Sequence, residues 1–348
     1  MINKQSIYYW FFFPLLALLS AGSLTSCIYD SVLEEEDTSG KSTLSITMRG
    51  ITTTDPGSSG SYDDYVETLR IIGFDANGSV VCNELHEGTD FAIINDALNI
   101  TQTMIEAFQG GVCDFYFIAN EEGYKVYDSQ TTLSNYLVTP DLQKESLDNC
   151  LIATPTEITT LGSSLILMTT SVRSTLKPGD NTINNIELVR CFAKVQLKII
   201  DKTGSATVGE NPVLTGTCPK FYSLWDGSTT GNWASFDDNK VDIPLALKEE
   251  TIEVDGQAYP LHTSQEIYFP ERLFGEGNNE KVNAMKFSFT LNGKSYKPAI
   301  ANSEGTDFNI RRNTHYTVTA TLNSTPVVTF NIEVIPWTEV EVDVPPFE

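Results

Sequence analysis

Residues 313–348 read NTHYTVTATLNSTPVVTFNIEVIPWTEVEVDVPPFE, and this last stretch of the chain decides the fold class. From Tyr316 to Leu322, apolar residues alternate with threonine, which is the pattern of a strand with one buried face. The alternation resumes from Val328 to Val334 after a short polar break. The chain is therefore predicted to end in extended strands.

A third alternating run closes the sequence. Pro336 interrupts the ladder, because proline has no N–H to donate. Beyond it, Val340, Val342 and Val344 alternate with acidic residues. A terminal strand with one apolar face can pair with its own sheet or with the open edge of another molecule's sheet.

Length and composition restrict the class of protein. The chain has 348 residues, a length that suits two domains, and it is 41% hydrophobic and 20% charged, so it can bury real cores. Its 46 acidic and 22 basic residues give a net charge of −24. A charge of this sign and size repels nucleic acid and anionic membrane surfaces, so we expect no nucleic-acid partner.

Short strands separated by turns recur along the whole chain. Residues 41–48 predict a first strand with Leu44, Ile46 and Met48 on one face. An Asn-Gly turn at residues 77–78 predicts a hairpin, and residues 112–120 (VCDFYFIAN) predict a buried strand.

Three segments have less regular patterns. Residues 96–108 carry Leu98, Ile105 and Phe108 and predict a helical turn, and residues 129–147 predict one or two short helices. Residues 185–200 form the longest β-rich run, expected to cross from one domain to the next. Together these patterns predict an all-β protein of two sandwiches with a few short helices.

The N-terminal residues predict export. A basic start and an apolar core of about a dozen residues, followed by small residues, make a secretory signal that is too short for a membrane span. Leu24-Thr25-Ser26-Cys27 resembles a bacterial lipobox, in which Cys27 is acylated; the alternative is an ordinary signal peptide. The predicted division is a signal peptide over residues 1–26, an acidic tether over 27–40, and domains over 41–186 and 187–348.

A candidate protease site follows the first strand. Arg49 stands between that strand and a Gly/Ser/Pro-rich stretch at residues 51–61. Exposed polar loops are where chains are most easily cut. The alternative is a surface arginine without a role.

Motifs of catalysis and metal binding are missing from the sequence. His86, His262 and His315 stand in no metal-ligand spacing, and no nucleophile elbow or phosphate-binding loop occurs. We therefore expect no enzyme, metal or cofactor.

Aromatic residues and cysteines leave two further questions. Tyr222, Trp225 and Trp233 either stack on sugars or pack in the interior. Without Cys27, five cysteines remain, so at least one thiol stays free or pairs between chains. Most of them lie in apolar strand contexts, where cysteine behaves as a small hydrophobic residue; these are Cys82, Cys113, Cys150, Cys191 and Cys218.

Taken together, these motifs resemble the fimbrillins of Bacteroidales-type (type V) fimbriae. Besides the lipobox, the matching stretches are IIGFDANGSVV (71–81), FYFIANE (115–121), LVRCFAKVQLKI (188–199) and RRNTHYTVTATL (311–322) running into IEVIPW (332–337). The family's R-x-x-A-K-V signature falls on Arg190, Ala193, Lys194 and Val195.

The resemblance implies a fold and a mechanism of polymerisation. It implies two tandem transthyretin-like sandwiches in an outer-membrane lipoprotein that becomes a subunit of an adhesive cell-surface fimbria (pilus). Cys27 would carry the lipid, an arginine-specific protease would cut after Arg49, and the strand of Leu44, Ile46 and Met48 would be removed. A donor strand of another fimbrial subunit, in a homo- or hetero-polymer, would replace it; the candidate donor residues are Val328, Phe330, Ile332, Val334, Val340, Val342 and Val344.

One other function of a different class fits the sequence. A surface glycan-binding lipoprotein of a polysaccharide-uptake system would also be acidic, lipidated and all-β. A row of exposed aromatic side chains would favour that function, and a detachable first strand favours the fimbrial subunit.

Overall fold

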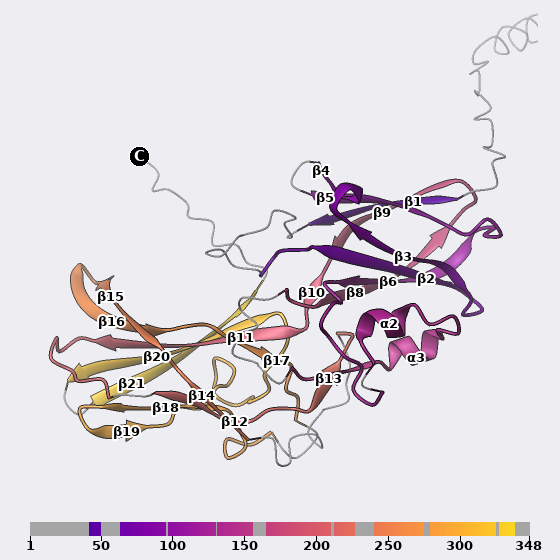
Figure 1. Ribbon diagram of the computed structural model, residues 1–348. Coiled ribbons are helices and arrows are strands. Elements are labelled where there is room, and N and C mark those ends of the chain that lie inside the picture. Colours follow the sequence, from indigo (N-terminus) through magenta and orange to yellow (C-terminus); the bar gives the residue numbers. More distant parts are fainter. Residues whose placement is uncertain are drawn as a thin grey trace, which may run out of the picture.

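The computed structural model describes residues 42–49, 63–94, 97–129, 131–155, 165–209, 212–226, 240–274, 279–324 and 327–337. These residues are mostly in strands, with two short helices and one 3₁₀ turn, as the alternating patterns predicted. Figure 1 shows two groups of sheets side by side, joined at a seam where β10 leads into β11.

The first sandwich is made of two sheets. One has the order β4-β5-β1-β9 and contains β1 (Thr43–Arg49), β4 (Ala92–Ile94), β5 (Ala97–Thr103) and β9 (Asp180–Glu187). The other has the order β10-β8-β6-β2-β3 and contains β2 (Thr68–Asp75), β3 (Val80–Glu87), β6 (Gly111–Ala119), β8 (Met168–Leu176) and β10 (Val189–Arg190). A 3₁₀ turn, η2 (Gly88–Asp90), links β3 to β4.

A helical layer covers the far face of the second of these sheets. It contains α2 (Leu133–Leu137), which is capped by the Thr132 side chain, and α3 (Lys144–Asp148). Leu133 and Leu147 belong to the same core as Ile72 and Tyr116 of the sheet. Because this sheet is covered on both faces, β2 and β6 are nearly continuous apolar runs rather than alternating ones.

The second sandwich also has two sheets. The larger has the order β15-β16-β11-β20-β21 and contains β11 (Phe192–Asp201), β15 (Leu247–Val254), β16 (Gln257–Ser264), β20 (Thr314–Ser324) and β21 (Val327–Pro336), with β17 (Ile267–Pro270) also pairing with β11. The smaller contains β12 (Val213–Thr217), β14 (Lys240–Pro244), β18 (Lys286–Leu291) and β19 (Lys294–Tyr296). A small ladder of β7 (Leu151–Ala153) and β13 (Phe221–Ser223) connects the two halves.

Two predicted segments fold differently from expectation. The helical turn predicted over residues 96–108 is wrong, because residues 97–103 form β5, whose Leu98, Ile100 and Gln102 alternate into the core. Residues 98–103 pair with β1, and this pairing outweighs the sparse helical spacing of the apolar residues. The β-rich run over residues 185–200 is divided among β9, β10 and β11, which lie in three different sheets.

The hairpin of β2 and β3 turns at Gly78, as predicted, with the Gly78 N–H donating to the Asp75 carbonyl at 3.0 Å. Gly73 matters for another reason, since it lies between β3 and β6 in a crowded layer. A Cβ at this position would come within 2.8 Å of the Phe115 ring and 2.9 Å of the Cys82 Sγ.

The substitution Gly73→Ala is therefore expected to lower the free energy of unfolding by about 1–3 kcal/mol, because the packed neighbours must shift. Urea unfolding of the variant measures the effect. Ser79→Ala, in the adjacent turn, is the control and is expected to change stability by about 0.5 kcal/mol or less. Equal stability of the two variants would contradict the close packing at Gly73.

Candidate functional site

The first strand, β1, lies inside a sheet rather than at its edge. It pairs antiparallel with β5 in an unbroken register from Thr43 to Met48. On its other side it pairs parallel with β9, which puts Thr43 opposite Asp180 and Arg49 opposite Glu187. Taking β1 out of the sheet would leave two strand edges without partners.

The apolar face of β1 is sealed in the core of the first sandwich. Leu44, Ile46 and Met48 are 0%, 1% and 0% exposed, and they share a core cluster with Phe115 and Phe117 of β6. Full burial of such side chains stabilises a fold by about 1.5–3 kcal/mol each. Thr43, Ser45 and Thr47, which alternate with these residues, are polar and uncharged and are at least partly exposed. These three side chains hold β1 in place, as their alternation predicted.

Polar contacts fix the position at which β1 begins. The Gly179 N–H donates to Ser42 Oγ at 3.1 Å, and the Met104 N–H donates to the Ser42 carbonyl at 2.8 Å. The Thr43 hydroxyl donates to the Asp180 carboxylate. The register of β1 is therefore set at its first residues.

The edge of β9 that faces β1 is irregular. Ile46 lies opposite Ile183, but Met48 lies opposite Ile186, so β9 carries one extra residue between the two pairs. Asn185, in this bulge, has φ 59°, a left-handed conformation that asparagine tolerates better than most residues. A strand that takes the place of β1 must match this bulge.

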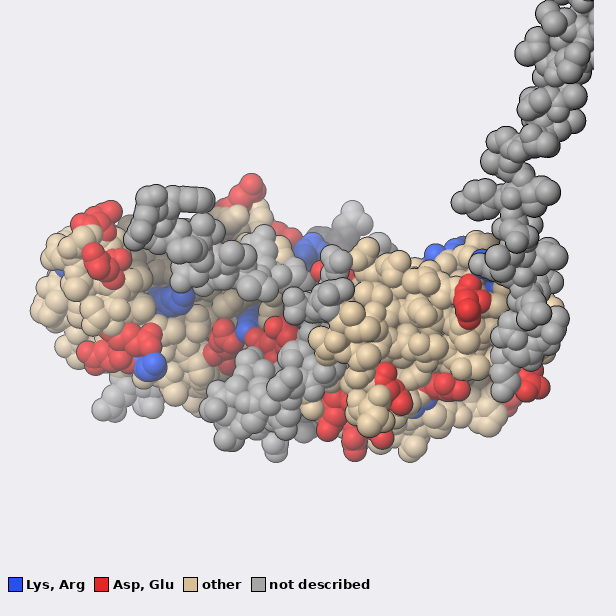
Figure 2. Space-filling model, turned by 90° about the horizontal axis from the view of Figure 1, so that it is seen from above, with Lys and Arg blue, Asp and Glu red and all other residues tan. Residues whose placement is uncertain are grey.

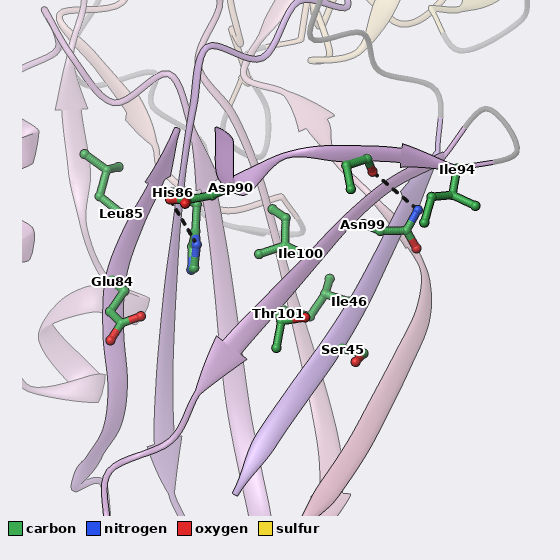
Figure 3. A pocket seen from close by; sticks show the side chains of 11 residues that line it. Ser45, Ile46, Glu84, Leu85, His86, Asp90, Ile94, Asn99, Ile100 and Thr101 are labelled. Carbon is green, nitrogen blue, oxygen red and sulfur yellow. Dashed lines mark hydrogen bonds and ion pairs between the residues drawn. The ribbon is translucent and has the colours of Figure 1, made fainter. Parts of the chain in front are cut away.

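A hollow of about 700 Å³ opens beside β1, between β3, η2, β4 and β5 (Figure 3). Ile46 and Ile100 line it together with Leu85 and Ile94, which are exposed at the surface. The apolar interior thus approaches the surface at this edge of the sandwich. No sequence motif indicates this hollow, although the apolar run at residues 91–94 lies beside it.

A buried polar network adjoins the hollow. Gln102 is fully buried and lies opposite Leu44 in the register. Its Oε1 is 2.9 Å from the His86 Nε2, and its Nε2 donates to Glu84 at 3.0 Å and to the Thr103 carbonyl at 2.7 Å. Because these partners all lie outside β1, a strand in the place of β1 needs only an apolar residue at this position.

The two candidate donor segments differ in what the structure describes. Val328, Phe330, Ile332 and Val334 lie on β21, which pairs with β20 from Thr314 opposite Pro336 to Leu322 opposite Val328. This strand is the edge of its sheet, and Phe330 is 43% exposed. Val340, Val342 and Val344 lie outside the described residues, as does Cys27.

The five cysteines beyond Cys27 are free thiols, and each is buried. Burial raises the pKa of Cys82 and Cys150 to about 12 and that of Cys113 to about 11. A thiol that stays protonated at neutral pH is a poor nucleophile. These side chains therefore behave as small hydrophobic residues, as the sequence suggested.

Two of the three aromatic residues considered for sugar stacking pack in the interior. Tyr222 is 0% exposed, and the Trp225 indole N–H donates to the Leu147 carbonyl at 2.6 Å. Trp233 lies outside the described residues. Within the described ranges, no group of three His, Cys, Asp or Glu residues is placed to hold a metal ion, and no helix is long and apolar enough to span a bilayer.

Solved structures of other proteins share this fold. The tip fimbrial protein Mfa3 from Porphyromonas gingivalis, solved with a C-terminal truncation, superposes with a TM-score of 0.57 at 15% identity over 85% of this chain and 100% of that chain. A putative cell adhesion protein from Parabacteroides distasonis gives a TM-score of 0.53 at 15% identity, over 85% and 98% of the two chains. At this identity the likeness is one of fold. No relative was found among curated proteins.

The family follows from the sequence itself. Residues 42–211 match the family described as major fimbrial subunit protein (FimA). This match over residues 42–211 confirms the fimbrial subunit family that the motifs predicted. The family is one of structural subunits rather than enzymes.

Proposed function

We propose that this protein is a structural subunit of a cell-surface fimbria that is exported as a lipoprotein, processed after Arg49 and polymerised by strand exchange. Its partners would be other fimbrial subunits, and the assembled fimbria would contribute to adhesion. The family match over residues 42–211 supports the fimbrial role. The burial and pairing of β1 support the exchange.

The observation that carries the proposal is the position of β1. A strand paired on both sides, with three sealed apolar residues, ends at Arg49. One cut after this residue would separate β1 from the rest of the chain without breaking any other strand. Nothing in the described part of the chain lies over the outer face of this sheet in Figure 1, so β1 could leave without displacing a further layer.

The energetics favour replacement of β1 over an empty groove. Departure of β1 uncovers the core around Leu44, Ile46 and Met48 and leaves the ladders of β5 and β9 open. A new strand recovers about 25 cal/mol for each Å² of apolar surface, together with backbone hydrogen bonds on both sides. Since the donor and the groove belong to different surfaces, the contact is head-to-tail and makes a filament.

Of the two candidate donors, we favour residues 338–348. β21 is paired with β20 from Val327 to Pro336, so it would have to leave β20 before it could fill a groove. Val340, Val342 and Val344 repeat the spacing of the β1 face. The intervening Glu341 and Asp343 would then lie on the outer face.

The charge distribution suits such a donor. Figure 2 shows a broad area with few charges over the first sandwich, while acidic side chains gather along its rim and over the other half. On the outer face, β1 and β5 present serine, threonine and asparagine. An acidic donor strand would therefore meet uncharged side chains along the middle of this sheet, and acidic neighbours only at its two ends, where Asp180 and Glu187 of β9 lie.

Export and domain limits belong to the same proposal. Residues 1–26 would be the signal peptide, Cys27 the lipid anchor in the outer membrane before processing, and residues 27–40 the tether. The division into units of residues 41–186 and 187–348 is supported by the passage from β9 and β10 of the first sandwich to β11 of the second.

The protein isolated from cells is expected to begin at Gly50, because an arginine-specific protease would cut after Arg49. The substitution Arg49→Lys should leave a chain that begins at an acylated Cys27 and forms no multimers stable in detergent without boiling. N-terminal sequencing and gel electrophoresis measure both results. Arg173→Lys, at an exposed arginine of β8, is the matched control and should behave as the wild type.

A second variant separates processing from assembly. Deletion of residues 338–348 is expected to leave the start at Gly50 and abolish the multimers. A wild-type chain that begins at Cys27 and stays monomeric would exclude the proposed polymerisation. The buried positions of Tyr222 and Trp225 give no support to a glycan-binding face.

A further inference from the structure

Two cations and two aromatic rings meet where β21 ends. The Trp337 ring centroid lies 5.0 Å from the Arg190 guanidinium carbon and 4.8 Å from the Lys194 Nζ. The Tyr268 ring is 5.6 Å from the Trp337 ring, centroid to centroid. Both cations are buried, and a desolvated cation over an indole is the most favourable form of this contact.

Carboxylates from an early part of the chain fix the two cations. The Arg190 Nε donates to the Asp63 carbonyl at 2.8 Å, and its guanidinium pairs with Asp64. Lys194 pairs with Asp63 and, at 2.9 Å, with Glu266. These partners hold both cations in position whether or not the indole is present, so the binding site for the Trp337 ring is preformed.

Backbone contacts tie the same point to both sandwiches. The Trp337 N–H donates to the Asn313 carbonyl at 2.9 Å, and the Asn313 N–H donates to the Phe192 carbonyl at 2.8 Å. The Arg190 Nη1 donates to Asn313 Oδ1 at 2.9 Å. Arg190 lies on β10, in the first sandwich, so Trp337 is fastened across the seam.

These contacts lie at the end of an edge strand. Among the described strands, β21 pairs with β20 and forms an edge of the sheet, and its side chains are mostly exposed. An antiparallel edge strand that is pulled from its end opens one residue pair at a time, beginning at that end. A pull on residues 338–348 would act first on Trp337 and then on the pair of Pro336 with Thr314, which is the last pair of the ladder at this end.

We propose that Asp63, Asp64, Arg190, Lys194, Tyr268 and Trp337 form a C-terminal anchor. The anchor fixes the root of the last segment to the first sandwich, so a pull on that segment passes through Arg190 and Lys194 instead of peeling β21 from β20. That the anchor carries force between subunits of a filament rests on the proposed function. The contacts of the anchor itself lie within a single chain.

A cut after Arg49 would create a new N-terminus, and the anchor also holds the chain that follows it. Asp63 and Asp64 are the first described residues after Arg49, and they hold the cations on which Trp337 rests. A cut after Arg49 would therefore leave the root of the donor segment in place.

Single-molecule pulling of the full chain tests the anchor. One handle is attached at the C-terminus and the other at Ser171→Cys, an exposed position on β8 of the first sandwich. At a fixed force, Trp337→Leu is expected to speed the opening of β21 about tenfold, the order expected for the loss of one or two desolvated cation–π contacts. Trp337→Phe keeps an aromatic face and should be intermediate. Val327→Ala, at an exposed position at the other end of the same strand, is the control and should leave the opening rate unchanged.

A double-mutant cycle assigns the effect to the cation. Lys194→Met should speed opening in the wild-type background and have a smaller effect in the Trp337→Leu background. If Trp337→Leu and Val327→Ala open at the same rate, the anchor is refuted. If the anchor passes this test while deletion of residues 338–348 leaves cellular multimers intact, the proposed donor is wrong and the anchor stands.

Discussion

Ile46→Ala is expected to lower the free energy of unfolding of the first sandwich by about 2–5 kcal/mol. The side chain is 1% exposed and lies between Leu44 and Met48 on the sealed face of β1. Its truncation removes apolar contacts and leaves a cavity, since the paired strands on both sides prevent collapse. Hydrogen exchange of the β5 and β9 amides measures this local stability.

The control for this prediction lies one position away. Ser45→Ala changes the exposed outer face of the same strand and should alter stability by about 0.5 kcal/mol or less. After a cut at Arg49, the Ile46→Ala chain should also lose its N-terminal fragment sooner than the Ser45→Ala chain. Equal protection of β5 and β9 in the two variants would show that β1 is not held by its apolar face.

The second large effect is expected at a buried ion pair in the same sandwich. Arg70 binds Glu121 through two hydrogen bonds of 2.8 Å, with side-chain exposures of 6% and 2%. Glu121→Ala leaves the guanidinium buried with Asn83 Oδ1 as its remaining acceptor, at 3.0 Å. A buried charge without its counter-ion is expected to cost about 3–5 kcal/mol in unfolding free energy, measured by urea denaturation.

An exposed pair of similar geometry provides the comparison. Arg173 also binds Asp114 through two hydrogen bonds, but the Arg173 side chain is 69% exposed and that of Asp114 is 17% exposed. Asp114→Ala should therefore cost about 1 kcal/mol or less. A double change of Arg70 and Glu121 to methionine should recover most of the loss of the single variant. Equal losses for Glu121→Ala and Asp114→Ala would show that burial does not decide the strength of these pairs.

Acid should weaken the exposed pair in a defined direction. The hydrogen bond from Arg173 lowers the pKa of Asp114 below its usual value. The contribution of this pair is therefore present above the unfolded pKa of Asp114 and is lost as the pH falls through the folded pKa. Chemical shifts of the Asp114 carboxyl carbon against pH measure this titration, with Asp114→Asn as the assignment control.

Strands with a clear period of two could be predicted from the sequence. The apolar face of β1, the hairpin at Gly78 and the two last strands follow from alternation and turn chemistry alone, because these signals are local. The helices at residues 133–137 and 144–148 also lie in the segment whose polar residues and leucine spacing predicted them, and the Thr132 side chain caps the first of the two. The conformation of β5 does not, because its pairing with β1 decides it.

Convergence of distant residues could not be predicted in this way. The hollow beside Ile46 depends on how the edges of two sheets lie in space. The contacts of Trp337 with Arg190 and Lys194 join residues that no periodicity relates, although all three lie in the family-like motifs. Sequence patterns identified these residues as members of motifs but gave no reason for their proximity.

The parallel pairing of β1 with β9 has a consequence for the order of folding. Thr43 is fastened to Asp180, 137 positions later in the chain. Loop closure over such a distance is entropically costly, so contacts of this range form late. During synthesis and export, β1 could pair with β5 on one side, but its second ladder would wait until β9 is complete. Until then the edge of β1 that faces β9 would stay open, and an open strand edge invites pairing with other chains.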